Sequence, residues 1–167
     1  KPEFSAYNRG MLYGDAVFET LRYSSGKISF WEDHYFRLMA SMRILRMEIP
    51  MNFTLELLEA ELLKTINASN LKDKSASVRL TVIRNAGGKY LPEDNNVSFY
   101  AFASELNDPF FIMNEASYEV DLYKDHYLNA DLLSTLKTAN KLIHVTGSIF
   151  AKENNLANCL LINTNKT

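Results

Sequence analysis

The chain has 167 residues, enough for one domain or two small ones, and its 47% hydrophobic and 23% charged residues are typical of a folded protein. The net charge is −2, with acids and bases interspersed, so we expect no nucleic-acid partner. A single cysteine excludes an internal disulfide and a thiolate metal cluster. No signal peptide and no membrane-spanning apolar run are visible, so we expect a cytoplasmic protein with no membrane partner.

The first half of the chain alternates between strand and helix patterns. Residues 16–23 and 27–31 are predicted strands joined by a Ser-Ser-Gly turn. A helix over about 31–46 follows, and FTLELLEAELLKTINASN predicts a second one. The apolar stripes of the two helices comprise Leu38 and Leu45 on the first and Leu55, Leu58, Leu62 and Ile66 on the second.

Two further strands are expected before a break in the chain. SVRLTVIR alternates with period two, so Arg79 and Thr81 share the face opposite Val78, Leu80 and Val82. VSFYAFASEL is rich in aromatic residues and also predicts a strand. The break at LNDPFF leads us to expect a linker at 108–111, between a smaller N-terminal α/β domain at 1–107 and the beginning of a larger domain at 112–167.

The C-terminal part continues the mixture of strands and helices. SYEVDLYK predicts a strand, 125–137 a loop, 138–154 a helix and LANCLLIN a buried strand that contains Cys159. Gly147 inside that helix costs about 1 kcal/mol against alanine, so we expect a close packing contact there. The fold class predicted is α+β (mixed α/β).

Several functional motifs are missing from the sequence. It contains no phosphate-binding loop, no G-x-G-x-x-G and no G-x-S-x-G, and the three histidines are scattered. We therefore expect no metal site.

Four segments together carry a resemblance to a known family: RGMLYGDAVFETLRYSSGKI, HYFRLMASMRIL, VRLTVIRNAGGKYLP and LKTANKLIHVTGSIFAKENNLANCLLIN. In this order and spacing they resemble the class IV aminotransferases, pyridoxal-phosphate enzymes of fold type IV. The family includes branched-chain aminotransferases, D-amino-acid aminotransferases and aminodeoxychorismate lyases. The resemblance covers nearly the whole chain and implies the two-domain fold type IV architecture.

The resemblance implies that Lys137 is the catalytic lysine, which binds pyridoxal 5'-phosphate as a Schiff base and afterwards moves a proton. Such an amine must be neutral part of the time, so burial or a nearby cation must disfavour its protonated form. We expect Lys137 at a loop-to-helix junction behind Leu132, Leu133 and Leu136. Its local sequence alone would favour a solvated surface lysine, and it is the other three segments that reverse this interpretation.

The resemblance assigns the cofactor's phosphate to Arg37, whose planar guanidinium matches phosphate oxygens. His34 lies three residues earlier on the same helix face. The alternative for Arg37 is an exposed ion pair with Glu32 or Asp33.

The substrate pocket implied by the resemblance includes Tyr13, Phe18 and Arg79. Tyr13 and Phe18 would equally suit a core, and Arg79 would equally suit a solvated strand face. Lys89, in the GGKY turn, is a weaker candidate for an anion contact.

The implied reaction moves an amino group between an amino acid, with the branched-chain type favoured, and a 2-oxo acid. The alternative is aminodeoxychorismate lyase, which forms 4-aminobenzoate and pyruvate, because Leu142 replaces a tyrosine typical of branched-chain enzymes and KTANKL resembles the lyases. A third reading is an inactive fragment or a non-catalytic binding protein on the same fold.

The ends of the chain suggest that the C-terminal domain is incomplete. The chain begins KPEFSAYNRG and stops at LLINTNKT, and the family's glutamate for the pyridine nitrogen would lie beyond Thr167. The resemblance also implies a homodimer.

Overall fold

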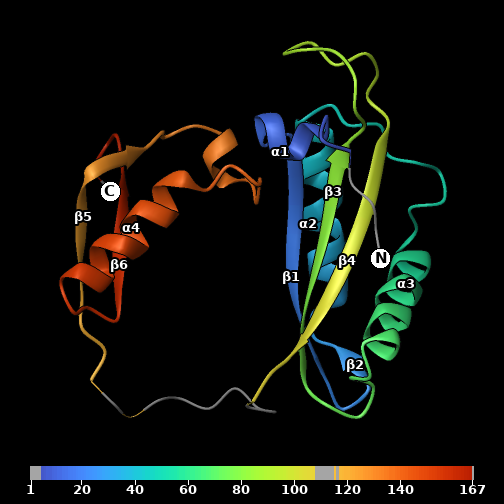
Figure 1. The fold of residues 1–167 in the computed structure, drawn as a ribbon, viewed down its shortest axis with the longest axis horizontal. Helices are drawn as coiled ribbons and strands as arrows, with labels where there is room; N and C mark the ends of the chain where they lie inside the picture. Colours follow the sequence, from blue (N-terminus) through green and yellow to red (C-terminus); the bar gives the residue numbers. More distant parts are fainter. Residues whose placement is uncertain (1–4, 108–114, 116, 167) are drawn as a thin grey trace. The chain divides into compact units, whose positions relative to one another are not determined.

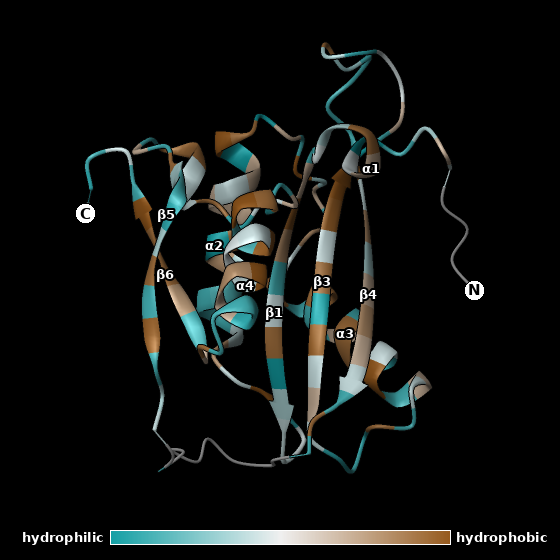
Figure 2. Ribbon diagram, turned by 60° about the vertical axis from the view of Figure 1, so that its left-hand side comes forward, coloured by the Kyte–Doolittle hydropathy of each residue, from teal (hydrophilic) through white to brown (hydrophobic). Residues whose placement is uncertain are grey.

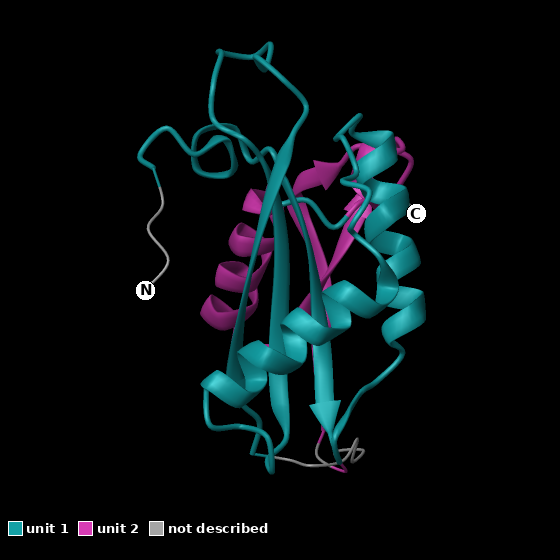
Figure 3. Ribbon diagram, turned by 90° about the vertical axis from the view of Figure 1, so that its right-hand side faces the viewer, with its two compact units in different colours: residues 1–112, 137–139 teal, residues 113–136, 140–167 magenta. Residues whose placement is uncertain are grey.

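The computed structural model describes residues 5–107, 115 and 117–166. The chain divides into two compact units, which Figure 3 distinguishes by colour. Unit 1 comprises residues 1–112 with 137–139, and unit 2 comprises 113–136 with 140–167. The expected domains at 1–107 and 112–167 stay a prediction, and the expected linker at 108–111 lies outside the described residues. No helix of the described part has the length and apolarity of a membrane span.

Unit 1 is built on a four-stranded sheet in the order β2-β1-β3-β4 (Figure 1). β1 is Ala16–Ser24, β2 is Lys27–Ile28, β3 is Ala76–Arg84 and β4 is Val97–Glu105. Every neighbouring pair is antiparallel, and the register places Phe18 of β1 opposite Thr81, which in turn lies opposite Tyr100 of β4.

Helices α2 (Trp31–Ile44) and α3 (Leu55–Ala68) pack against the same face of this sheet. Figure 2 shows hydrophobic and hydrophilic residues alternating along most of β3, as expected for a strand with one buried face. The core residues are Val17, Leu21 and Tyr23 of β1, Val78, Leu80 and Val82 of β3, Leu38, Met39 and Met42 of α2, and Leu58, Leu62 and Ile66 of α3. The predicted apolar stripes of both helices are confirmed.

A buried ion-pair cluster fixes the start of β1. The Asp15 carboxylate accepts hydrogen bonds from Arg9 Nε and Arg84 Nε, both at 2.9 Å. Arg9 belongs to α1 (Arg9–Tyr13), a short helix that the sequence did not lead us to expect, and its guanidinium also donates to the Gly87 and Lys89 carbonyls. The aspartate of the YGD motif thus ties α1 and the loop after β3 to the sheet.

Unit 2 contains a parallel pair of strands, β5 (Val120–Leu128) and β6 (Asn158–Asn163), together with η1 (Leu133–Thr135) and α4 (Leu142–Glu153). The expected close approach at Gly147 is confirmed, because a Cβ there would lie 2.9 Å from Cys159 Sγ and from Leu161 Cδ2. Cys159 is only partly buried.

Three expected boundaries were wrong. The loop predicted from residue 125 is strand as far as Leu128, because β5 pairs with β6 again at Leu128 after an irregularity that follows Tyr123. The strand predicted over 27–31 ends at Ile28, because Phe30 adopts a positive φ of 54° and α2 begins at Trp31. The helix predicted from residue 138 begins only at Leu142, because Lys137 and Ala139 use their backbone groups to bind β1 instead.

Candidate functional site

A single acidic side chain lies at the inner face of β1. Val17, Glu19, Leu21 and Tyr23 alternate toward the helices, and the Glu19 side chain is 1% exposed. A carboxylate among apolar neighbours is costly unless charged or hydrogen-bonding groups compensate it. The partners of Glu19 therefore define the site.

Two side chains of α2 bind Glu19. Arg37 donates from Nε to Oε1 at 2.7 Å and from Nη2 to Oε2 at 2.6 Å, which is a bidentate pair. His34 Nδ1 lies 2.9 Å from Oε2 and 2.9 Å from Arg37 Nη2. Since the guanidinium only donates and the carboxylate only accepts, a protonated Nδ1 donates to Glu19, and an unprotonated Nδ1 accepts from Arg37.

Burial and pairing act on the pKa of Glu19 in opposite directions. Burial raises this pKa, but hydrogen bonds from Arg37 and His34 and the charges of Arg37 and Lys137 outweigh it and hold the pKa below its ordinary value. The hydrogen bond to Glu19 raises the pKa of Arg37. The carboxylate is therefore ionised under neutral conditions.

Lys137 reaches this group from a later part of the chain. Thr138 forms an isolated antiparallel bridge with Val17, the Phe18 N–H donates to the Lys137 carbonyl at 2.9 Å, and the Ala139 N–H donates to the Ala16 carbonyl at 2.9 Å. These bonds place Lys137 Nζ 3.7 Å from Glu19 Oε2.

The structure therefore corrects the expected setting of Lys137. This residue lies at the side of a strand rather than at the mouth of a helix. Of the three leucines expected to shield it, Leu132 and Leu133 are 59% and 58% exposed, whereas Leu136 is buried. The Lys137 side chain itself keeps 35% of its surface exposed, so its amine is open to a small molecule.

Arg37 is also open to an anion. Its side chain is 47% exposed, and Nε and Nη2 are engaged with Glu19 and His34, while Nη1 has no hydrogen-bond partner among the described residues. The expected alternative pair with Glu32 or Asp33 is not the bond that holds it, although the Asp33 charge contributes to its raised pKa. An accessible amine and an accessible guanidinium beside one carboxylate fit a cofactor that carries an aldehyde and a phosphate.

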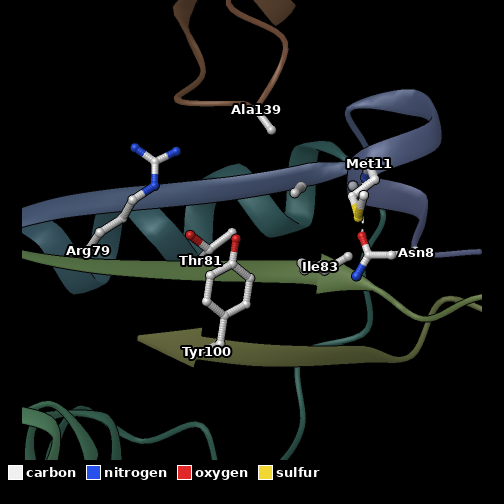
Figure 4. A pocket seen from close by; sticks show the side chains of 9 residues that line it. Asn8, Met11, Arg79, Thr81, Ile83, Tyr100 and Ala139 are labelled. Carbon is white, nitrogen blue, oxygen red and sulfur yellow. Dashed lines mark hydrogen bonds between the residues drawn. The ribbon is translucent and has the colours of Figure 1, made fainter. Parts of the chain in front are cut away.

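The face of the sheet away from the helices carries a pocket. It has a volume of about 180 Å³ and is lined by residues that include Arg79, Thr81, Tyr100, Met11 and Ala139 (Figure 4). Phe18 lies on the same face, and the Arg79 guanidinium stacks 3.5 Å from the centre of its ring. Lys137 Nζ lies 5.4 Å from the same ring, so Phe18 connects two of the predicted site residues.

Tyr13 is placed differently from the other predicted substrate residues. Its ring packs 5.7 Å from that of Tyr90 and 5.0 Å from the Arg9 guanidinium, and it is not among the residues that line the pocket. The backbone carbonyl of Lys89, the weaker candidate, accepts a bond from Arg9.

Sequence reasoning did not identify Glu19 or His34 as site residues. A signal was present for Glu19, because it occupies the core-facing position between Val17 and Leu21, where a charge requires a partner. Its partners Arg37 and His34 lie on α2, and no spacing in the sequence indicates that this helix contacts Glu19 of β1.

Comparisons with known proteins agree with the resemblance. A family model described as amino-transferase class IV matches residues 16–167. A protein assigned as a branched-chain-amino-acid aminotransferase of Methanocaldococcus jannaschii is 37% identical over 83 residues, which cover 50% of this chain and 27% of that protein. The aminodeoxychorismate lyase of Vibrio harveyi is 28% identical over 82 residues, covering 49% of this chain and 28% of the lyase.

Solved structures show the same fold. The branched-chain amino acid aminotransferase of Escherichia coli superposes with a TM-score of 0.81 at 17% identity, covering 98% of this chain and 55% of that one. The chain thus spans little more than half the length of this neighbour. Because the family model extends over most of the sequence, the chain belongs to the class IV aminotransferases, a family of pyridoxal-phosphate-dependent enzymes.

Proposed function

We propose that the protein transfers an amino group between an amino acid, of the branched-chain type, and a 2-oxo acid. The observation that carries this proposal is the position of Lys137 Nζ, 3.7 Å from the carboxylate that Arg37 and His34 also bind. From the family resemblance we also propose that the protein is a cytoplasmic homodimer.

Pyridoxal phosphate, when bound, supplies an aldehyde that reacts with amines and a ring that accepts electrons. The chain's own residues have three tasks. Lys137 would hold the cofactor and move a proton at Nζ, which lies 3.7 Å from the ionised Glu19. Arg37 would bind the phosphate, while Glu19 holds its guanidinium through Nε and Nη2.

The open face of the sheet is the proposed substrate side. The Arg79 guanidinium, held by its stacking on Phe18, is positioned to attract the substrate carboxylate. Tyr13 is also proposed to contact the substrate, on the basis of the family resemblance alone.

Covalent trapping tests the role of Lys137. The protein is loaded with pyridoxal phosphate and reduced with borohydride, and the labelled peptide is identified by mass spectrometry. We expect the visible absorbance to bleach and the label to lie on Lys137, and we expect Lys137→Ala to lose both the label and turnover. Lys152→Ala, which removes an exposed lysine of α4, is the matched control and should retain both. A label elsewhere, or turnover in Lys137→Ala, would refute the assignment.

The lyase is a second candidate because Leu142 and KTANKL depart from the branched-chain pattern. Release of 4-aminobenzoate from aminodeoxychorismate, measured beside amino transfer from leucine or glutamate, separates the two reactions. Failure of the intact protein to bind the cofactor would favour a non-catalytic protein on this fold.

A further inference from the structure

One polar atom of the pocket has no partner. Thr81 is 2% exposed, and its Oγ1 makes no hydrogen bond within the described part of the chain. A buried hydroxyl without a partner destabilises the folded state, and native proteins contain few of them. Thr81 lines the cavity of about 180 Å³, so a bound ligand is the available source of a partner.

Its neighbours across the sheet do not meet this need. The register places Phe18 on one side of Thr81 and Tyr100 on the other, and Oγ1 bonds to neither. Figure 4 shows the Thr81 side chain on the pocket face of β3, beside Tyr100 of β4 and between Arg79 and Ile83.

A positive charge lies two residues earlier on the same face of β3. Residues at i and i+2 of a strand are about 6.6 Å apart, so Arg79 and Thr81 can contact the same small ligand. The Arg79 guanidinium carbon lies over the Phe18 ring, 3.5 Å from its centre, and Arg79 makes no ion pair with a carboxylate of the described residues. A stacked guanidinium keeps the N–H donors in its plane for a ligand. The rest of the lining comprises the apolar side chains of Met11, Ala16, Ile83 and Ala139 together with Gly10 and the polar residues Asn8 and Tyr100.

We propose that Thr81 is a specificity-determining residue, whose hydroxyl donates a hydrogen bond to a substrate carboxylate held beside Arg79. The pocket then binds an amino or oxo acid through the carboxylate of the substrate. An aliphatic substrate side chain beside Thr81 and Arg79 would be disfavoured, because it would leave Thr81 Oγ1 without a hydrogen-bond partner. This inference rests on the proposed function, which makes such an acid the expected ligand.

Titration calorimetry with an unreactive acid tests the inference. The probe is 4-methylpentanoate, which carries a carboxylate but no amino or oxo group, and 4-methylpentanamide is its uncharged counterpart. We expect the intact, cofactor-loaded protein to bind the acid and to bind the amide far more weakly. Thr81→Val, which removes the hydroxyl and keeps the shape, should weaken binding of the acid about tenfold or more.

Two variants serve as controls. Thr81→Ser keeps the hydroxyl and should bind the acid nearly as the wild type does. Thr20→Val alters an exposed threonine opposite Arg79 that does not line the pocket, and it should leave the affinity unchanged. If Thr81→Val does not fold, Thr81→Ala repeats the test.

Stability gives an independent readout. Because Oγ1 is unpaired without ligand, Thr81→Val should raise the midpoint of thermal unfolding of the ligand-free protein while it weakens binding. A purely structural role for Thr81 would lower the midpoint instead.

Either of two results would overturn the inference: Thr81→Val binds the acid as tightly as the wild type, or the amide binds as tightly as the acid. The proposed function fails separately, if borohydride places no label on Lys137 while binding of the acid still depends on Thr81.

Discussion

Glu19 is held by three side chains that reach it from two separate parts of the chain. Arg37 and His34 approach from α2, and Lys137 approaches from the segment bound to β1. Because the pKa of Glu19 is lowered in the folded protein, its contribution to the free energy of unfolding is present above the unfolded value of about 4.3. That contribution is lost as the pH falls through the folded pKa.

We therefore expect Glu19→Gln to lower the free energy of unfolding at pH 7 by about 1–3 kcal/mol, since Arg37 loses a charged partner but remains solvated. The deficit should begin to shrink as the pH falls below about 4.3, where the unfolded wild-type side chain takes up a proton, and it should vanish once the pH has fallen through the lowered pKa of the folded carboxyl. Urea unfolding at pH 7 and pH 3 measures both values. Glu32→Gln, at an exposed position of α2, is the control, and a deficit independent of pH would contradict the expectation.

At the scale of residues, the sequence predicted which side chains face the core or the site more readily than it predicted which side chains bind one another. The family motifs identified Lys137, and the structure places its amine in a group that also includes Arg37. Strand alternation implied that Glu19 faces inward, but its pairing with α2 depends on how that helix crosses the sheet. No pattern in the sequence predicts that Thr81 Oγ1 has no hydrogen-bond partner, because this depends on which polar groups the folded protein places near it.

Among the elements, α4 was correctly predicted to be a helix with a close packing contact at Gly147, but the residue at which it begins was not. Its expected start at residue 138 was wrong because the backbone of 137–139 pairs with β1, a long-range contact that overrides local helix preference. Helix α1 was missed because its five residues are too few to show a period.

Gly147 provides a test at the same scale. In an open helix Gly147→Ala would stabilise by about 1 kcal/mol, but here the new Cβ would meet Cys159 Sγ and Leu161 Cδ2 at 2.9 Å. Because overpacking costs about 1–3 kcal/mol, we expect a net loss of stability, partly relieved in the double variant with Cys159→Ala. Thermal unfolding followed by circular dichroism measures it. Ser148→Ala, at an exposed position of the same helix, is the control. If Gly147→Ala instead stabilises the protein, the side chains of β6 can move aside for the added Cβ at little energetic cost.

For the whole molecule, unit 1 is assembled from two distant parts of the sequence. Residues 137–139 belong to unit 1, although the chain on either side of them belongs to unit 2. They contribute no side chain to the hydrophobic core, so their attachment depends on backbone hydrogen bonds with β1. Placement of the amine and stability of the core should therefore be separable.

Ala139→Pro removes the N–H that donates to the Ala16 carbonyl. We expect the yield of borohydride label on Lys137 to fall severalfold, while the free energy of unfolding changes by no more than about 1 kcal/mol. Ala139→Gly keeps the donor and should label normally. Equal labelling of the proline variant would show that these hydrogen bonds do not position the lysine.

Thr138 follows all the strands of the unit 1 sheet in the sequence, and this order has a consequence during synthesis of the chain. A ribosome completes β1, β3 and β4 well before it adds this residue, so until then the Ala16 carbonyl and the Phe18 N–H lack the partners that they have in the folded protein. Exposed groups of this kind invite aggregation between growing chains. The three-residue segment that carries Lys137 thus also completes the backbone hydrogen bonding at this edge of the sheet.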